Sequence, residues 1–274
     1  MNTATANSSS TSSSVTPGIK TTSIKADGID IRCLEAGSGQ PLVYLHGAGG
    51  LRLSVAHRAL AENHHLIALE LPGFGKTPAN ATHTSARAIA ATMANAMRAL
   101  GIEACALMGH SLGANVALWL AIDHPGLAKT LILVAPTAIR PDDSGIGGAR
   151  PKEVAAQNPA HLWFSEVVGG DSLAAVRGLA QTLSGPPRDA ELEKAMGGVA
   201  VPVLVLFGTR SVIVSTDAAR EYTRALPKCF STLVYDAGHD IDLDRPEAVA
   251  AVVRNFLQNG ESFIVNRDNG MINP

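Results

Sequence analysis

A serine flanked by glycines directly after a short apolar run is the feature that most constrains this chain. The run 104–108 reads A-C-A-L-M, and the residues 109–113 that follow read G-H-S-L-G. The next residues, 114–120, have the composition of a helix. A G-x-S-x-G sequence between a buried strand and a helix places its serine on a sharp turn, where the glycines leave room for a substrate carbonyl. Ser111 is therefore predicted to be a nucleophile; the alternative is a solvent-facing serine in a Gly-rich turn.

Short apolar runs alternate with Ala-rich helical stretches, which is typical of an α/β fold with a mostly parallel sheet and helices on both faces. A hairpin near 20–34 is expected to start the sheet. Strands are expected at 41–45, 65–69, 105–108, 130–134, 203–207 and 232–235, and helices at 85–100, 112–124, 215–226 and 246–258.

One segment breaks this alternation. Residues 139–198 carry five prolines, several glycines and no strand-like run, which predicts a helical cap inserted after the strand ending at Val134. Loops at the carboxyl ends of parallel strands build the site in open α/β sheets, so a cap there would cover it. The expected organisation is a disordered Ser/Thr-rich stretch at 1–18, an α/β core at 19–138 and 199–260, the cap at 139–198 and a polar tail at 261–274.

Composition excludes several classes of partner. Hydrophobic residues make up 46% of the 274 residues and charged residues 17%, which indicates a globular protein with a large core. A net charge of -2 gives no reason to expect nucleic acid or an anionic membrane as partner. Cys33, Cys105 and Cys229 show neither metal-ligand spacing nor an even count for disulfides. We expect no metal and no cofactor.

The two ends of the chain bear on its compartment. Residues 1–16 contain neither Lys nor Arg and no apolar stretch, so no signal peptide is expected, and no apolar run is long enough to cross a membrane. Together with the unpaired cysteines, the lack of both kinds of segment favours a cytoplasmic location. The sequence leaves the oligomeric state open.

A serine hydroxyl needs a positioned base to take its proton. His239 follows the last expected strand and precedes Pro246, so it should lie at the same edge of the sheet as Ser111. It is the predicted base. Five other histidines lack such a placement and are expected to be surface or packing residues: His64, His65, His83, His124 and His161.

A second glycine-rich turn follows the strand at 41–45 and reads H-G-A-G-G at 46–50. Acyl transfer builds negative charge on a carbonyl oxygen, and backbone N–H groups aimed at it stabilise that charge. The N–H groups of Ala48 and Leu112 are the predicted pair. His46 is expected to hold the turn; a phosphate-binding loop is the weaker alternative because no G-K-[ST] follows. Substrate is expected to contact Gly47, Gly49 and His110.

These motifs, with L-P-G-F-G-K-T at 71–77 and Gly238-His239, resemble the α/β-hydrolase superfamily over about residues 24–257. The likeness is to the capped branch with a serine nucleophile, which holds carboxylesterases and carbon–carbon bond hydrolases. It implies acyl transfer from a small-molecule acyl substrate by a Ser–His–acid triad. The haloalkane dehalogenase and epoxide hydrolase branches use an aspartate nucleophile, so Ser111 argues against them.

The acid of that triad is missing from its usual place. The resemblance puts an aspartate where this chain has Ser211, and a neutral hydroxyl cannot offer the charge that stabilises the imidazolium. One reading takes the acid from elsewhere, with Asp142, Asp143 and Asp217 as candidates, although Asp217 is expected to cap a helix. Asp240 adjoins His239 and should point away from its ring. The favoured readings are a weakened triad or a disabling substitution.

Five other residues lie near the expected site or cap. Glu70 is expected to hold its loop by hydrogen bonds, and Trp119 to be buried. Arg210 is expected to be exposed rather than to bind an anionic substrate. Trp163 and Phe164 could line an acyl pocket, although packing of the cap explains them equally well.

Three functions follow from these features. The leading one is hydrolysis of an ester, thioester or lactone through an acyl-enzyme. The second is cleavage of a carbon–carbon bond in a diketone-like substrate, because both activities use the same motifs. The third is a binding protein on a hydrolase fold, which the missing aspartate favours and the intact Ser111 and His239 oppose.

Overall fold

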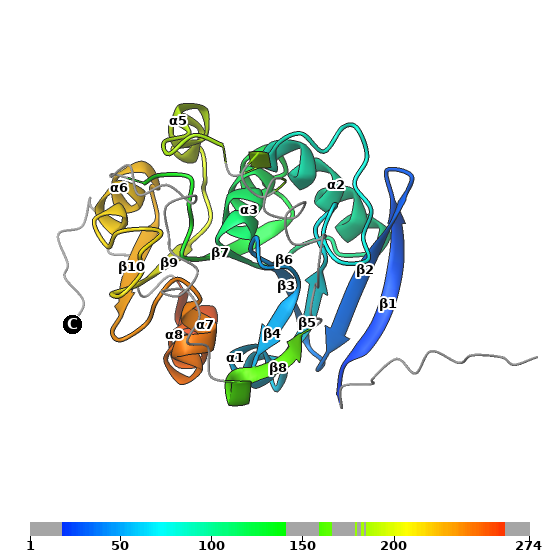
Figure 1. The fold of residues 1–274 in the computed structure, drawn as a ribbon, viewed down its shortest axis with the longest axis horizontal. Helices are drawn as coiled ribbons and strands as arrows, with labels where there is room; N and C mark the ends of the chain where they lie inside the picture. The colour runs from blue at the N-terminus through cyan, green and yellow to red at the C-terminus, as the bar shows by residue number, and fades with distance from the viewer. Residues whose placement is uncertain (1–17, 141–158, 166–178, 180–181, 184, 261–274) are drawn as a thin grey trace, which may run out of the picture.

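An eight-stranded sheet forms the centre of the molecule. The computed structural model describes residues 18–140, 159–165, 179, 182–183 and 185–260. An antiparallel hairpin at one edge pairs antiparallel with the next strand, and every further neighbour is parallel. The predicted mostly parallel α/β fold is confirmed (Figure 1). The spatial order is β1 (Lys20–Ala26), β2 (Ile29–Ala36), β5 (His64–Leu69), β3 (Gln40–Leu45), β6 (Cys105–His110), β7 (Ala128–Val134), β9 (Val203–Gly208) and β10 (Cys229–Val234).

Helices cover both faces of the sheet, each with its own hydrophobic cluster. On one face lie α2 (Ala86–Ala99), α3 (Leu112–Asp123), α5 (Ala190–Met196) and α6 (Ala218–Ala225). On the other lie α1 (Val55–Ala61), α7 (Ile241–Asp244) and α8 (Pro246–Asn259), as Figure 1 shows. The helices predicted at 85–100, 112–124, 215–226 and 246–258 correspond to α2, α3, α6 and α8.

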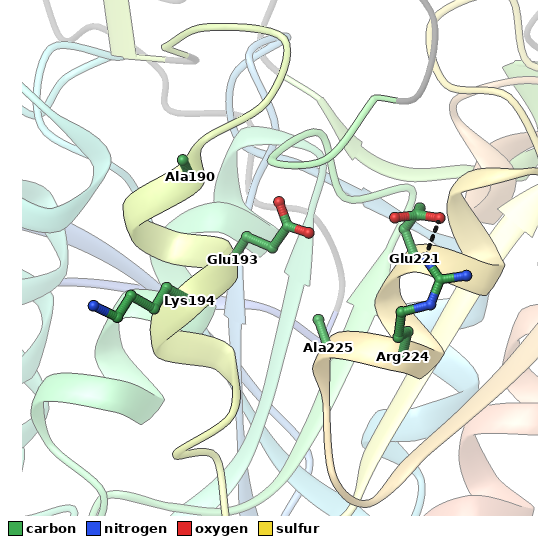
Figure 2. A pocket seen from close by; sticks show the side chains of 6 residues that line it. All are labelled: Ala190, Glu193, Lys194, Glu221, Arg224 and Ala225. Carbon is green, nitrogen blue, oxygen red and sulfur yellow. Dashed lines mark hydrogen bonds and ion pairs between the residues drawn. The ribbon is translucent and has the colours of Figure 1, made fainter.

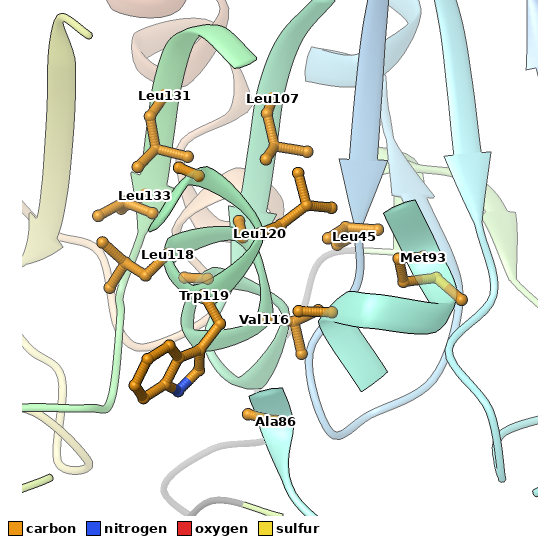
Figure 3. Close-up of a cluster of buried hydrophobic side chains, with 14 of the residues drawn as sticks. Leu45, Ala86, Met93, Leu107, Val116, Leu118, Trp119, Leu120, Leu131 and Leu133 are labelled. Atoms are coloured by element: carbon orange, nitrogen blue, oxygen red, sulfur yellow. The ribbon is translucent and has the colours of Figure 1, made fainter. Parts of the chain in front are cut away.

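The helix that follows Ser111 is buried around its whole circumference. All residues of α3 from Leu112 to Ala121 are buried, and a helix apolar on every side belongs in a core. Figure 3 shows Leu118, Trp119 and Leu120 of this helix among Leu107 of β6 and Leu131 of β7. Cys105 is buried in β6, as predicted for a small apolar residue. The nucleophile candidate therefore stands at the end of the most enclosed helix of the described chain.

The segment 139–198 contains a strand, which corrects the expectation that it holds none. Within its described part, the 3-10 turn η1 (Pro159–His161) leads into β8 (Leu162–Ser165), which pairs antiparallel with β4 (Arg52–Ser54). Such strands, four and three residues long, are too short for an alternating pattern to predict. Of the predicted segments 1–18 and 261–274, residues 1–17 and 261–274 lie outside the described residues, so these predictions stay untested there.

The described helices are short relative to the thickness of a bilayer. The longest in the described ranges, α2 and α8, have 14 residues each, and none there has the length and apolar character to cross a membrane.

We expect Gly113→Ala to be strongly destabilising. A Cβ at Gly113 would lie 2.2 Å from the carbonyl oxygen of Leu45 and 2.5 Å from that of His46, so α3 could not keep its approach to β3. Overpacking of this kind costs about 3 kcal/mol in free energy of unfolding. Gly126→Ala is the matched control, because a Cβ there meets nothing within 4 Å. Urea denaturation measures both; equal stability of the two variants would contradict this packing.

Candidate active site

Ser111 occupies a strained backbone turn between β6 and α3. Its φ of 52° and ψ of -115° lie outside the regions that non-glycine residues ordinarily adopt. Such a conformation costs on the order of 1–3 kcal/mol and persists only where the surroundings hold it. The N–H of Ser111 donates to the carbonyl of Val134 at 2.8 Å, and a Cβ at Gly109 would lie 2.4 Å from the Gly113 carbonyl oxygen. The glycines of the motif are thus required for this turn.

His239 lies beside that serine, as the sequence predicted. Its Nε2 is 2.8 Å from Ser111 Oγ, although 128 residues separate the two. Both side chains belong to largely buried residues, Ser111 being 8% exposed and His239 9% exposed. Burial, and next the neighbouring His110, lower the pKa of His239 to about 3, so the imidazole is neutral near pH 7.

The other ring nitrogen of His239 has no hydrogen-bond partner among the residues that the structure describes. Nδ1 is buried, and no group in the described part of the chain bonds to it. To accept the serine proton at Nε2, the neutral ring must carry its hydrogen on Nδ1. That arrangement leaves a buried N–H without an acceptor, at a cost of about 1–3 kcal/mol.

The loop that carries Ser211 lies next to the loop that carries His239, but the Ser211 hydroxyl bonds within its own turn. Its Oγ accepts from the N–H groups of Ile213 at 3.4 Å and Val214 at 3.2 Å. The backbone is held close to the His239 loop because the N–H of Arg210 donates to the carbonyl of Ala237 at 2.8 Å. The loop that carries the expected acid position therefore contacts the loop that carries His239, and the Ser211 hydroxyl is bonded within its own turn.

None of the alternative carboxylates in the described residues bonds to His239 Nδ1. Asp217 is at the N-cap position of α6, where its carboxylate accepts from Ser215 Oγ at 3.3 Å rather than from the helix backbone. Asp240 Oδ1 lies 3.2 Å from Arg52 Nη2, and Asp240 does not bond to His239 Nδ1. Asp142 and Asp143 lie outside the described residues.

The turn after β3 lies directly against the serine. The Gly50 N–H donates to the Gly47 carbonyl at 3.1 Å, which closes a turn with Ala48 at its second position. A Cβ at Gly47 would lie 2.8 Å from His110 Nδ1 and 3.1 Å from Ser111 Cβ. The Leu112 N–H is the first of α3, and the first N–H groups of a helix have no acceptor within it.

His46 holds this turn in the manner expected of a structural residue. Its Nδ1–H donates to the Gly47 carbonyl at 2.7 Å, and its Nε2 accepts from the Leu71 N–H at 2.9 Å. Burial lowers the pKa of His46 to about 4, and only the neutral ring can make both bonds.

Arg52 and Asp240 form an ion pair at the site that sequence reasoning missed. Arg52 Nη2 lies 3.2 Å from Asp240 Oδ1, and a Cβ at Gly49 would lie 2.8 Å from the same nitrogen. His110 Nε2 lies 3.6 Å from Asp240 Oδ1 and donates to the His239 carbonyl at 3.1 Å. Burial alone would raise the pKa of Asp240, but Arg52 and then His110 hold it below its ordinary value. The pair thus links the glycine turn to the His239 loop.

The remaining aromatic candidates make packing contacts. Phe164 is buried and Trp163 half-buried in β8, both against the cluster that lies on the α1 and α8 face. The guanidinium of Arg32 lies 5.3 Å from the centre of the Phe164 ring. Trp119 is buried in α3 as predicted.

Two charged residues have the structural roles that were expected of them. Glu70 Oε2 accepts from the N–H groups of Lys76 at 2.8 Å and Thr77 at 2.9 Å. Arg210 is exposed and pairs with Asp236 at 2.7 Å. Neither touches Ser111 or His239.

The five other histidines bond to partners away from Ser111, as expected. Their partners are the Leu60 carbonyl for His64, Glu35 for His65, Thr92 for His83, Arg98 for His124 and the Leu243 carbonyl for His161.

A surface groove of about 340 Å³ between α5 and α6 lies apart from these residues. Figure 2 shows charged side chains of both signs along it, with Glu221 paired to Arg224. Its lining holds no nucleophile beside a base. Across the described ranges no group of three His, Cys, Asp or Glu is arranged to hold a metal ion.

We expect the stability of the protein to fall as pH drops from about 6.5 towards 4. Burial lowers the pKa of His57, like that of His46, to about 4. Between about pH 6.5 and 4 both rings therefore stay neutral in the folded protein, whereas the same histidines bind protons in the unfolded chain. Each such histidine contributes up to about 1.4 kcal/mol per pH unit. His57→Gln should flatten the slope of unfolding free energy against pH.

The matched control for this experiment is Ser54→Ala. It removes the hydroxyl 3.0 Å from His57 Nδ1 without removing a titrating group, so it should lower stability and keep the slope. Urea denaturation at several pH values measures both variants, and an unchanged slope in His57→Gln would contradict the neutral buried state.

Comparison with known proteins identifies the family of this chain. At 25% identity the chain is similar to a 2-hydroxymuconate semialdehyde hydrolase of Pseudomonas putida, over 88% of this chain and 95% of that one. At 27% identity it is similar to a dihydrolipoyllysine-residue acetyltransferase component of an acetoin cleaving system of Cupriavidus necator, over 84% and 67%. The naproxen esterase of Bacillus subtilis shares the fold, with a TM-score of 0.67 and 17% identity over 87% and 91%. Residues 42–252 match the family described as alpha/beta hydrolase, and the chain belongs to that family.

Proposed function

We propose that this protein is a serine hydrolase that cleaves an ester, thioester or lactone through an acyl-enzyme. The observation that carries the proposal is the 2.8 Å contact between His239 Nε2 and Ser111 Oγ on a strained turn. A nucleophile within hydrogen-bond reach of a base is the arrangement that activates a hydroxyl. Esterases among the structures of the same fold support the assignment at the level of the fold.

Each residue has a definite part in the proposed reaction. His239 Nε2 takes the Ser111 proton as Oγ attacks the carbonyl carbon, and the N–H groups of Ala48 and Leu112 stabilise the resulting oxyanion. His239 then gives the proton to the leaving oxygen or sulfur as that bond breaks. Water, deprotonated by the same nitrogen, attacks the acyl-enzyme and releases the acid and free Ser111.

Ser211 should make this reaction slow. The imidazolium formed at His239 during attack has no carboxylate at Nδ1 in the described chain, and burial already disfavours the charged ring. In the serine-protease template, replacing the aspartate by a neutral amide lowers kcat about ten-thousand-fold by favouring the wrong tautomer. We therefore infer a weakened hydrolase that retains nucleophile and base.

Carbon–carbon bond cleavage is the second candidate, and similarity to two hydrolases favours it. One is the 2-hydroxymuconate semialdehyde hydrolase, and the other, at 23% identity, is a 2-hydroxy-6-oxo-6-(2'-aminophenyl)hexa-2,4-dienoic acid hydrolase of Metapseudomonas resinovorans. In this reaction His239 would transfer a proton to the carbon atom that leaves when the carbon–carbon bond breaks. Turnover of a vinylogous diketone acid without turnover of aryl esters would favour this candidate.

We expect Ser111→Ala to abolish labelling by a fluorophosphonate and hydrolysis of a short-chain p-nitrophenyl ester. The probe reacts with a serine activated by a base, so intact protein should be modified at Ser111 alone. Ser215→Ala is the control, because its hydroxyl bonds to Asp217 away from His239. Mass spectrometry of the labelled peptide gives the readout, and an unlabelled Ser111 in the intact protein would count against the hydrolase.

Ser211→Asp should raise the rate of ester hydrolysis by orders of magnitude, towards the ten-thousand-fold effect of the template. A carboxylate at this position would stabilise the imidazolium and raise the pKa of His239, so the acid limb of kcat/KM moves to higher pH. Ser211→Asn is the matched control, with the same shape and no charge. If Asn and Asp give equal rates and equal pH profiles, the missing charge is not the cause of slow turnover.

A further inference from the structure

The buried, unpartnered Nδ1 of His239 raises the question of what accepts its hydrogen. The residue is 9% exposed, and no group in the described ranges bonds to this nitrogen. The other ring nitrogen, Nε2, already lies within hydrogen-bond distance of Ser111 Oγ. Because a buried polar nitrogen without a partner is costly, a small acceptor that can reach it would bind with a gain in free energy.

Backbone contacts hold the loop that carries Ser211 against the loop that carries His239. A Cβ at Gly208 would lie only 2.1 Å from the Gly238 carbonyl oxygen, so the end of β9 touches the His239 loop directly. The N–H of Arg210 donates to Ala237 at 2.8 Å. Ser211 and His239 follow these contacts by one and two residues, which makes them neighbours.

The Ser211 turn also supplies donors that suit an anion. Two backbone N–H groups, of Ile213 and Val214, converge on Ser211 Oγ at 3.4 and 3.2 Å. A carboxylate has two oxygens and about four acceptor positions, so it can accept from such a pair and from an imidazole N–H together. Thr209, Arg210 and Val212 are exposed, which leaves this turn within reach of a small solute.

We propose that the Ser211 turn is a binding site for a small monocarboxylate anion of the size of formate or acetate, which pairs with His239 Nδ1–H. The bound anion supplies the acceptor and the negative charge that Ser211 lacks, and it activates the Ser111–His239 pair. Binding depends only on the unpartnered nitrogen and its surroundings. The activation rests on the proposed hydrolase function.

Binding is tested directly by nuclear magnetic resonance on protein labelled with ¹⁵N in its histidines. Sodium formate is added while sodium chloride keeps the ionic strength constant. A saturable shift of the His239 Nδ1–H signal is expected, assigned by its loss in His239→Gln. In Ser211→Asp the built-in carboxylate should prevent the shift.

Activation is tested by hydrolysis of a p-nitrophenyl ester in the same titration. Saturable acceleration of at least about tenfold is expected for the intact protein, which corresponds to about 1.4 kcal/mol of transition-state stabilisation. Ser211→Gly removes the competing hydroxyl and should be accelerated more. Ser211→Asp should not respond, and Ser111→Ala should remain inactive throughout.

The outcomes separate the two proposals. If Ser111 is labelled by a fluorophosphonate and Ser211→Asp is active, but formate changes neither signal nor rate, the anion site is wrong and the hydrolase stands. If formate shifts the His239 signal while no variant hydrolyses or is labelled, the site stands and the proposed reaction fails. Equal acceleration of Ser211→Asp, or by chloride alone, would overturn the site.

Discussion

The close approach of α3 to β3 is the constraint on which the site depends. Gly113 lies so near the Leu45 carbonyl that no Cβ fits, and the Ser111 N–H is tied to Val134 on the other side. These contacts hold Ser111 in a backbone conformation it would not adopt alone. α3 is buried on every side, so we infer that its packing against the sheet helps to hold this strained turn. The packing that stabilises the core therefore also holds Ser111 in its conformation.

The sequence predicted the frame of the fold and the central pair of the site. β6 and α3 could be placed because an apolar run, a glycine motif and a long helical run follow one another. Ser111 and His239 could be paired because parallel strands end at one edge of a sheet. β4 and β8 were not predicted because strands this short have too few residues to show an alternating pattern. Their pairing also joins segments more than a hundred residues apart, which no local pattern indicates.

The Arg52–Asp240 pair shows a different limit of sequence reasoning. Its partners are separated by 188 residues, and Arg52 belongs to the short strand β4. Only the fold brings the guanidinium under Gly49 and beside the His239 loop. A buried charge must be paired, and here the pairing also joins the two loops that flank Ser111. An aspartate beside a predicted catalytic histidine was the signal in the sequence, but it did not identify the partner.

Asp240 also shows why proximity of charge is no substitute for a hydrogen bond at Nδ1. Its charge acts to raise the pKa of His239, yet burial outweighs it and the pKa falls to about 3. The carboxylate lies 3.2 Å from Arg52 and 3.6 Å from His110, and both of these residues act to lower the pKa of His239. A carboxylate at residue 211 would differ from that of Asp240 in its orientation, because it could accept the hydrogen on His239 Nδ1. That hydrogen bond would fix the tautomer in which Nε2 is free to take the serine proton. We therefore infer that orientation as well as charge would limit the proposed reaction at Ser111 and His239.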